Sequence, residues 1–192
     1  MRRIRNENYN TLDAWNEIYK KERNEGKIRT NDPIWEPFVR YIPGNAKIID
    51  VGCGTGGFLR YIKKYRPSAE LTGLDHSEEA IFTAKEICPD NKFYYNFLDI
   101  TEQFDVAVCS EVLEHITDNF AFIENIVNLV KDDGYIITTT PWRWSDVERL
   151  HVWDYESADD ILELTQGKCM IIDYWINSHG SDLCVVMKKI KG

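Results

Sequence analysis

The strongest constraint on the fold is a glycine-rich turn that joins an apolar run to a helical pattern. The stretch IIDVGCGTGGFLRYI, residues 48–62, places Gly52, Gly54 and Gly56 directly after the apolar run AKIIDV, residues 46–51. Glycine lets a backbone turn tightly and approach a ligand without a clash at Cβ. Ligands of open parallel sheets bind beyond the carboxyl ends of the strands. The turn therefore predicts a site for a nucleotide-like cofactor.

From residue 46 onward, short apolar runs alternate with helical patterns. A helix is predicted after Ser77, a good N-cap followed by acids, and another after Thr117 and Asp118. Strand, helix and strand in this order require right-handed crossovers and a mostly parallel sheet. The predicted strands are residues 46–51, 70–74, 92–97, 104–110 and 134–140.

The end of the chain has a different pattern. Ser157 and Asp160 form a variant of the helix capping box, and Gly167 suits the end of that helix. Two runs rich in β-forming residues, 169–176 and 182–190, flank the turn sequence NSHGS. The sheet is therefore expected to finish with an antiparallel pair.

Composition restricts the possible functions. The chain has 192 residues, which is enough for one domain with a full core, and a net charge of −9, which argues against non-specific nucleic-acid binding. The five cysteines are scattered without a CxxC pair, so neither a zinc ribbon nor a disulfide framework is indicated. No apolar run has the length of a signal peptide core or a membrane helix. We expect a soluble, cytoplasmic protein, a monomer or homodimer that binds neither a membrane nor nucleic acid.

Acidic residues at successive strand ends narrow the choice of cofactor. The glycines alone also fit the dinucleotide pattern GxGxxG. Asp50, however, stands where it would repel a pyrophosphate and hold an ammonium group. Asp75 ends the second strand, where a carboxylate can accept from ribose hydroxyls, and Asp99 follows the third, beside the apolar Ile100. S-adenosylmethionine has an ammonium, a sulfonium and no phosphate, so it fits these acids.

The same segments resemble the successive motifs of the class I S-adenosylmethionine-dependent methyltransferases. The motifs are IIDVGCGTGGFL, LTGLDHS, NFLDI, FDVAVCSEVLEHI and DDGYIITTTP, between Ala46 and Pro141. The resemblance implies an α/β fold with a Rossmann-like, seven-stranded, mostly parallel sheet, an antiparallel last strand and helices on both faces. It also implies a cofactor site that is built on the turn of Gly52, Gly54 and Gly56. In this site Asp50 would lie near the methionine end and Asp75 at the ribose. His76 would lie along the adenine, Asp99 and Ile100 at the adenine edge, and Ser110 would close the site.

The segment SEVLEHI carries the candidate residues for the acceptor. Glu111, Glu114 and His115 are spaced to share one face of a short helix. With His151 they resemble the metal site of the RNA 3′-terminal 2′-O-methyltransferases. The tripeptide LEH also recurs in small-molecule methyltransferases of this class, where the histidine packs or hydrogen-bonds without metal. We therefore predict no metal, and His115, His151 and Glu111 as the catalytic group, with one histidine as the base for a hydroxyl acceptor.

Three segments are expected within a single methyltransferase domain, residues 1–192. Residues 1–45 form a helical lid, in which Trp15 and Tyr19 lie one turn apart and either shield the cofactor or make a core contact. Residues 46–141 form the cofactor-binding core. Residues 142–192 form the acceptor link, a helix and the terminal hairpin; in the link, tryptophans either cover the acceptor or pack the loop, and Arg143 or Arg149 would hold a carboxylate or phosphate.

The predicted function is transfer of a methyl group from S-adenosylmethionine to an oxygen or nitrogen of a small polar acceptor, with S-adenosylhomocysteine as product. Two alternatives remain open at this point: a metal-assisted RNA 3′-terminal ribose 2′-O-methyltransferase, and a non-catalytic subunit that binds S-adenosylmethionine.

Overall fold

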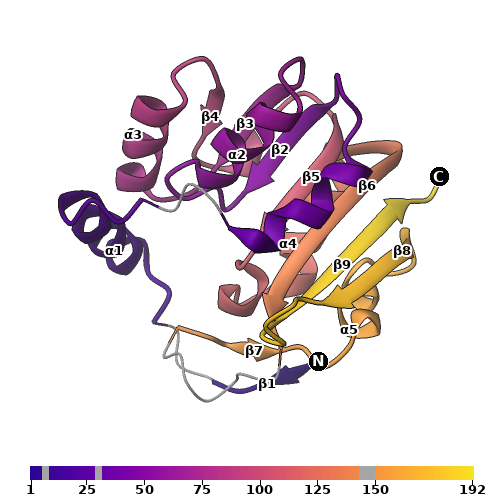
Figure 1. Cartoon of the computed structure of the whole chain (residues 1–192). Helices are drawn as coiled ribbons and strands as arrows, with labels where there is room; N and C mark the ends of the chain where they lie inside the picture. Colours follow the sequence, from indigo (N-terminus) through magenta and orange to yellow (C-terminus); the bar gives the residue numbers. More distant parts are fainter. Residues whose placement is uncertain (6–8, 29–31, 143–149) are drawn as a thin grey trace. The chain divides into compact units, whose positions relative to one another are not determined.

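A computed structural model describes residues 1–5, 9–28, 32–142 and 150–192 (Figure 1). Among these residues, seven strands are hydrogen-bonded in the order β4-β3-β2-β5-β6-β9-β8, and β1 and β7 form a separate two-stranded sheet. The pairs β2–β3 and β3–β4 are parallel, whereas β6–β9 and β8–β9 are antiparallel. The predicted fold class is therefore confirmed. The strands are β1 Arg2–Arg3, β2 Lys47–Val51, β3 Glu70–Leu74, β4 Lys92–Tyr94, β5 Phe104–Ser110, β6 Val130–Pro141, β7 Trp153–Asp154, β8 Cys169–Ile176 and β9 Asp182–Lys189.

The helices connect these strands in the predicted alternation. Ser77 caps α3 by accepting a hydrogen bond from the Ala80 N–H, and Asp118 caps α4 in the same way through the Ala121 N–H. The α-helices are α1 Leu12–Asn24, α2 Gly57–Tyr65, α3 Glu78–Ile87, α4 Asn119–Leu129 and α5 Ala158–Leu164; the 3₁₀ helices are η1 Pro33–Tyr41, η2 Phe97–Asp99 and η3 Leu113–His115.

The chain divides into two compact units. One contains residues 11–106, and the other contains residues 1–10 and 107–192. These units do not follow the boundaries at residues 45 and 141 that the sequence indicated, and the single-domain organisation stays a prediction. No helix in the described part of the chain is long and apolar enough to cross a membrane.

In the unit of residues 11–106, strands β2 and β3 are buried over most of their length. Their apolar side chains occupy both faces, as expected for parallel strands between helices. Helix α2 buries Phe58, Leu59 and Ile62 on one side and leaves its lysines exposed. The bounds of the first two predicted strands, residues 46–51 and 70–74, are confirmed to within one residue. This packing holds the carboxyl end of β2, where the glycine turn begins.

In the other unit, strand β6 begins at Val130, four residues before the predicted start. Helix α4 ends at Leu129, and the buried Val130 already has an extended backbone, so helix and strand join without a loop. Asp133, with φ of +62°, pairs with Lys188 and Lys191. The charged sequence KDDG, residues 131–134, therefore belongs to the start of the strand.

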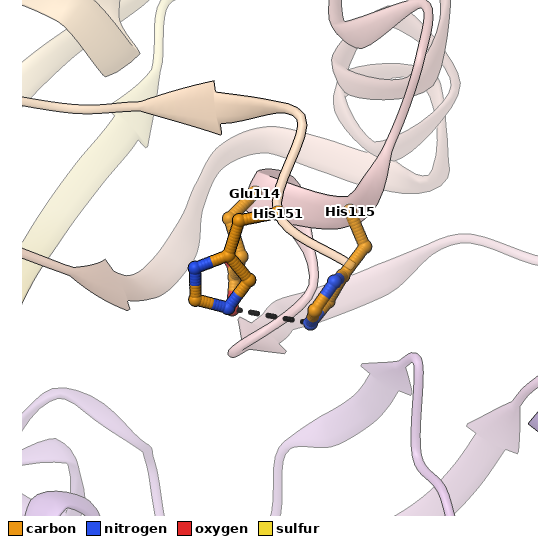
Figure 2. A group of neighbouring side chains, drawn as sticks. All are labelled: Glu114, His115 and His151. Atoms are coloured by element: carbon orange, nitrogen blue, oxygen red, sulfur yellow. Dashed lines mark ion pairs between the residues drawn. The ribbon is translucent and has the colours of Figure 1, made fainter. Parts of the chain in front are cut away.

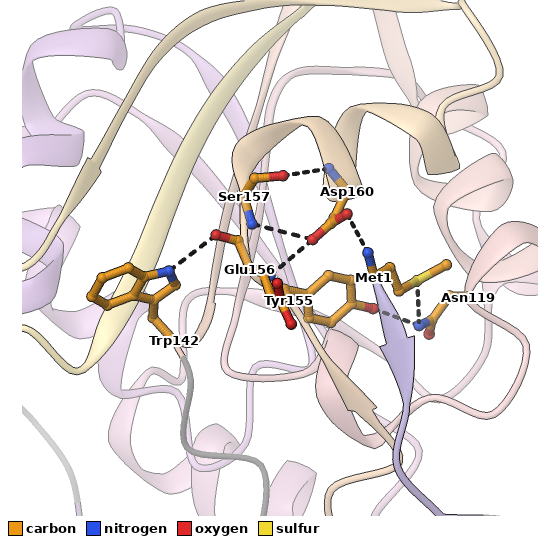
Figure 3. Close-up of polar contacts among 7 residues, drawn as sticks. All are labelled: Met1, Asn119, Trp142, Tyr155, Glu156, Ser157 and Asp160. Atoms are coloured by element: carbon orange, nitrogen blue, oxygen red, sulfur yellow. Dashed lines mark hydrogen bonds and ion pairs between the residues drawn. The ribbon is translucent and has the colours of Figure 1, made fainter.

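The predicted C-terminal elements are confirmed. The Ser157 hydroxyl accepts from the Asp160 N–H, and the Asp160 carboxylate accepts from the Ser157 N–H, which completes the capping box of α5 (Figure 3). The same carboxylate contacts the backbone nitrogen of Met1, and the Trp142 indole donates to the Glu156 carbonyl. Strands β8 and β9 form the expected hairpin. These contacts connect β1, α5 and the end of β6 within one unit.

Gly73 in β3 offers a test of how closely this sheet is packed. A Cβ at this position would lie 2.8 Å from the Cys53 sulfur and 2.8 Å from the Phe93 ring. We expect Gly73→Ala to lower the free energy of unfolding by about 1–3 kcal/mol, because buried atoms must move to admit the methyl group. Urea unfolding measures the change. Gly44→Ala is the matched control, since nothing lies within 4 Å of its added methyl group; equal stability of both variants would contradict the packing.

Candidate functional site

The glycine turn after β2 has the conformation that the sequence predicted. Gly52, Gly54 and Gly56 all have positive φ, at 76°, 50° and 82°. Other residue types rarely adopt this conformation, so the turn depends on glycine at these positions. Gly56 is also the N-cap of α2, which follows at once. The turn therefore presents backbone rather than side chains at the carboxyl end of β2.

Asp75 fastens this turn to the start of α3. One carboxylate oxygen accepts from the Gly54 N–H at 2.9 Å, and the other accepts from the Ser77 N–H at 2.9 Å. The side chain is only 6% exposed. A carboxylate oxygen has more than one acceptor position, so each can still bind a ligand hydroxyl. Asp75 thus has a structural role that the sequence did not reveal.

Asp50 is the second buried acid of the turn. It is 3% exposed, and burial together with the neighbouring Asp75 carboxyl raises the pKa of Asp50 to about 8. Burial also raises the pKa of Asp75, against the two backbone hydrogen bonds that lower it. Two buried acids side by side are unfavourable unless a cation compensates for them. A ligand with an ammonium group would do so, whereas a pyrophosphate would add to the repulsion.

The residues predicted at the adenine have different environments. His76 is exposed, and Ile100 is 9% exposed. The third predicted strand, residues 92–97, was expected to end just before Asp99, but β4 ends at Tyr94. Asp99 lies in η2, where it accepts a hydrogen bond from the Asn96 side chain at 2.7 Å. Strand β4 pairs with β3 over three residues. The adenine contacts of these residues stay predictions.

Helix α1 lies against α3 and contributes two further residues to the turn (Figure 1). The Tyr19 hydroxyl lies 3.1 Å from the position that a Cβ of residue 54 would occupy. The Asn16 side-chain oxygen accepts from the Ser77 hydroxyl at 2.6 Å. Trp15 and Tyr19 stack with ring centroids 5.9 Å apart, so they share one face as expected. Tyr19 therefore lies against the glycine turn. Asn16 was not predicted as a site residue, because nothing in the sequence marks it except its place on the same helix.

In the other unit, Glu114, His115 and His151 form a cluster. Figure 2 shows the three side chains pointing toward one another. Their ligand atoms all lie within 4.8 Å of one another, and the His115 Nε2 is 3.6 Å from a Glu114 carboxylate oxygen. The Val152 N–H donates to the Glu114 carbonyl at 2.7 Å, which holds the segment before β7 against η3. The structure therefore brings together residues that are 36 positions apart in the sequence.

The electrostatics of the cluster are set by burial. Glu114 is 2% exposed, and burial followed by the charge of Glu111 raises the pKa of Glu114 well above its usual range. Its Oε2 has no hydrogen-bond partner among the described residues. The His115 Nδ1 lies 3.1 Å from the Leu150 carbonyl, and since a carbonyl only accepts, this contact places the proton on Nδ1. Burial lowers the pKa of His151, which favours a neutral ring there as well.

The prediction that Glu111 shares a helix face with Glu114 and His115 is wrong. Helix η3 begins only at Leu113, and Glu111 has a φ of +58°, which turns the backbone before the helix. The Glu111 carboxylate accepts instead from the Thr139 hydroxyl at 2.9 Å, in β6. Ser110 lies 2.9 Å from the same hydroxyl. The catalytic role of Glu111 and the cofactor contact of Ser110 therefore stay predictions.

The aromatic link is described only in part. The Trp153 indole donates to the Ile116 carbonyl at 2.8 Å, and Trp142 donates to the Glu156 carbonyl at 3.1 Å. These bonds agree with the interpretation that the two tryptophans pack the link on its own unit. Arg143, Trp144 and Arg149 lie outside the described residues.

Comparison with known proteins decides between the cofactor classes. The family described as "Methyltransferase domain" matches residues 49–136, which contain the glycine turn, Asp75 and the LEH segment. Residues 49–136 are therefore similar to a methyltransferase domain. The resemblance seen in the sequence, and S-adenosylmethionine as the cofactor of this family, are thereby confirmed.

Similar sequences include methyltransferases of known name. The chain is 32% identical over 130 residues to a ubiquinone biosynthesis O-methyltransferase of Neisseria meningitidis serogroup C, covering 60% of this chain and 54% of that protein. It is 34% identical over 103 residues to the protein of the same name from Stutzerimonas stutzeri, covering 49% and 44%. The chain thus spans about half the length of these relatives.

Solved structures share the fold. A TehB-like S-adenosylmethionine-dependent methyltransferase of Corynebacterium glutamicum has a TM-score of 0.69 at 20% identity, covering 92% of this chain and 99% of that chain. The N-methyltransferase NodS of Bradyrhizobium japonicum, in complex with S-adenosylhomocysteine, has a TM-score of 0.64 at 17% identity, covering 90% and 98%. At these identities the likeness establishes the architecture.

The raised pKa of Asp50 predicts a specific dependence of stability on pH. The pKa of Asp50 is about 8 in the folded protein, against an ordinary value of 3.8. Between pH 3.8 and pH 8, the folded protein therefore binds a proton at Asp50 that the unfolded chain has lost. The free energy of unfolding therefore falls as the pH rises through this window. Asp50→Asn removes the titration, so its stability relative to the wild type should rise by more than about 1 kcal/mol between pH 5 and pH 8. Urea unfolding at both pH values measures the difference; a constant difference would show that Asp50 does not titrate in this range.

Proposed function

We propose that this chain is an enzyme that transfers a methyl group from S-adenosylmethionine to an oxygen or nitrogen of a small polar acceptor. The observation that carries the proposal is the pair of buried acids, Asp50 and Asp75, at a turn of left-handed glycines. The match of the surrounding residues to the methyltransferase domain supports it.

The turn supplies the groups that such a cofactor needs. When bound, S-adenosylmethionine supplies a methyl group on a positively charged sulfur. Asp50 would hold the ammonium group by a charge-assisted hydrogen bond, and this interaction would return its carboxyl group to the ionised form. Asp75 would accept from ribose hydroxyls with the lone pairs that its backbone bonds leave. Tyr19 covers Gly54 from α1 and would limit access of water to the turn.

A hydroxyl acceptor is favoured over an amine. The relatives from Neisseria and Stutzerimonas are named O-methyltransferases. A hydroxyl must lose its proton as it attacks, so this reaction needs a base near the acceptor. His115 is suited to the role because its Nδ1 is directed at the Leu150 carbonyl, which leaves Nε2 as the acceptor of a proton. His151 is the second candidate for the base.

The cofactor proposal is tested by binding and transfer together. Isothermal titration should show that the wild type binds S-adenosylmethionine, and Asp50→Asn should weaken this binding by about tenfold or more, since the charge on the ammonium loses its partner. Transfer of a labelled methyl group to extracted metabolites then tests catalysis. Binding without transfer to any acceptor would favour a non-catalytic subunit. Binding of a nicotinamide dinucleotide in place of S-adenosylmethionine would contradict the proposal.

A metal-assisted version of the same reaction is a second candidate, and the cluster of Glu114, His115 and His151 favours it. A carboxylate and two imidazoles are a common ligand set for Zn²⁺, Fe²⁺ and Mn²⁺. The Glu114 Oε2, which has no hydrogen-bond partner among the described residues, and the His115 Nε2 are ligand atoms suited to such an ion. A bound divalent cation would ionise an acceptor hydroxyl without a separate base.

The two versions differ in their response to chelators. If the metal takes part, dialysis against EDTA should abolish methyl transfer, and Mn²⁺ or Zn²⁺ should restore it. Glu114→Gln and His151→Ala should each lower the affinity for the metal, measured by titration, by at least about tenfold. Glu124→Gln is a matched control, because Glu124 is exposed on α4 and pairs with Lys168. Full activity after chelation would leave the histidine base as the mechanism.

A further inference from the structure

The contact between β1 and β7 continues beyond both strands and brings Arg5 to Val152, the residue that follows His151. The two strands are antiparallel, and the next hydrogen bond runs from the Ile4 N–H to the Val152 carbonyl at 2.8 Å. The Arg5 N–H donates to the same carbonyl at 3.4 Å, so the backbone of Arg5 lies beside the segment that carries His151.

The adjacent pairs of this ribbon show that Arg5 differs from the other arginines of the segment. Arg2 pairs with the Asp154 carboxylate at 3.1 Å. The Arg3 Nε–H donates to the Arg5 carbonyl at 3.1 Å, and its guanidinium covers the Trp153 ring at 5.5 Å from the centroid. Each of these two side chains therefore has a partner within the ribbon.

The Arg5 side chain has an unsatisfied donor. Its Nε is covered by the protein and has no hydrogen-bond partner among the described residues. A covered N–H without an acceptor is unfavourable, and a charged one more so. Arginine presents Nε–H and Nη–H as a planar fork that fits two oxygens of a carboxylate or a phosphate. The missing partner is therefore an oxyanion.

The cluster beside Arg5 does not supply that oxyanion. One Glu114 carboxylate oxygen lies 3.6 Å from the His115 Nε2, so this carboxyl group faces the histidine. Asp154 is occupied by Arg2. The positive charge of Arg5 also contributes to the lowered pKa of His151, after burial, which agrees with the closeness of the two groups.

We propose that Arg5 binds an anionic group of the methyl acceptor, a carboxylate or a phosphate, beside His151. The inference rests on the proposed function, and it narrows the acceptor from any small polar molecule to one that carries an oxyanion. The anion would lie next to the Glu114, His115 and His151 cluster, so the hydroxyl or amine to be methylated would be held one side chain away from the candidate base.

Histidine NMR tests this subsite without cofactor or methyl transfer. The chain has four histidines, so ¹⁵N-histidine labelling gives few signals. The protein is first freed of metal by dialysis against a chelator, so that an anion cannot bind through a metal ion. Sodium phosphate and sodium benzoate are then titrated at constant ionic strength. We expect at least one of them to shift the His151 signal in a saturable way, and the one that does identifies the class of oxyanion.

Variants separate the fork of Arg5 from its surroundings. Arg5→Gln should weaken the binding by about tenfold or more, and Arg5→Lys should retain part of it, because the charge remains without the fork. Arg2→Gln is the matched control, because it removes the same charge from an arginine that pairs with Asp154, and it should leave the affinity within about twofold. Unchanged His115 signals verify that each variant keeps the ribbon. Equal affinity of Arg5→Gln and the wild type, or no saturable shift with either anion, would overturn the proposal, whatever the outcome for S-adenosylmethionine.

Discussion

The glycine turn of this protein is held in place by one buried carboxylate. Asp75 accepts from the backbone N–H groups of Gly54 and Ser77, which belong to two different connections of the sheet. Hydrogen bonds from backbone N–H groups to a carboxylate are stronger than those between neutral groups, and burial removes the competing water. Ser77 in turn caps α3 and binds Asn16 of α1. The turn, the helix start and the covering helix therefore depend on the same side chain.

Such an arrangement stores electrostatic energy at the site. Burial raises the pKa of both Asp50 and Asp75, and the charge of Asp75 raises that of Asp50 further, so ionising these buried acids has an unfavourable effect on folding. Proteins tolerate local costs of this kind where a ligand offsets them. A cationic ligand would offset the unfavourable free energy of the two buried carboxylates. The same feature that lowers stability therefore favours binding of a positive charge and disfavours binding of a phosphate.

The site on the other unit is built by long-range contacts. A backbone bond from Val152 to Glu114 and the contact between His115 and the Leu150 carbonyl bring the segment before β7 to η3. The adjacent ribbon of β1 and β7 then adds Arg5 from the start of the chain. Three separate parts of the sequence thus supply a carboxyl, two imidazoles and a guanidinium. The sequence grouped Glu114, His115 and His151 only through a resemblance to a known site, and it gave no signal for Arg5, because an arginine near the start of a chain is an ordinary residue when it is considered alone.

Much of the fold could be predicted because its signals are local. The glycines at 52, 54 and 56, the caps Ser77 and Asp118, and the capping box of α5 all act within a few residues, so the sequence alone determined the turn, the helix starts and the class of cofactor. Only the tertiary structure decided that β4 ends before Asp99, that the Glu111 carboxylate binds Thr139, and that Arg5 contacts Val152. These outcomes depend on strand pairing and burial between distant segments. The energy of such contacts is absent from any short stretch of residues.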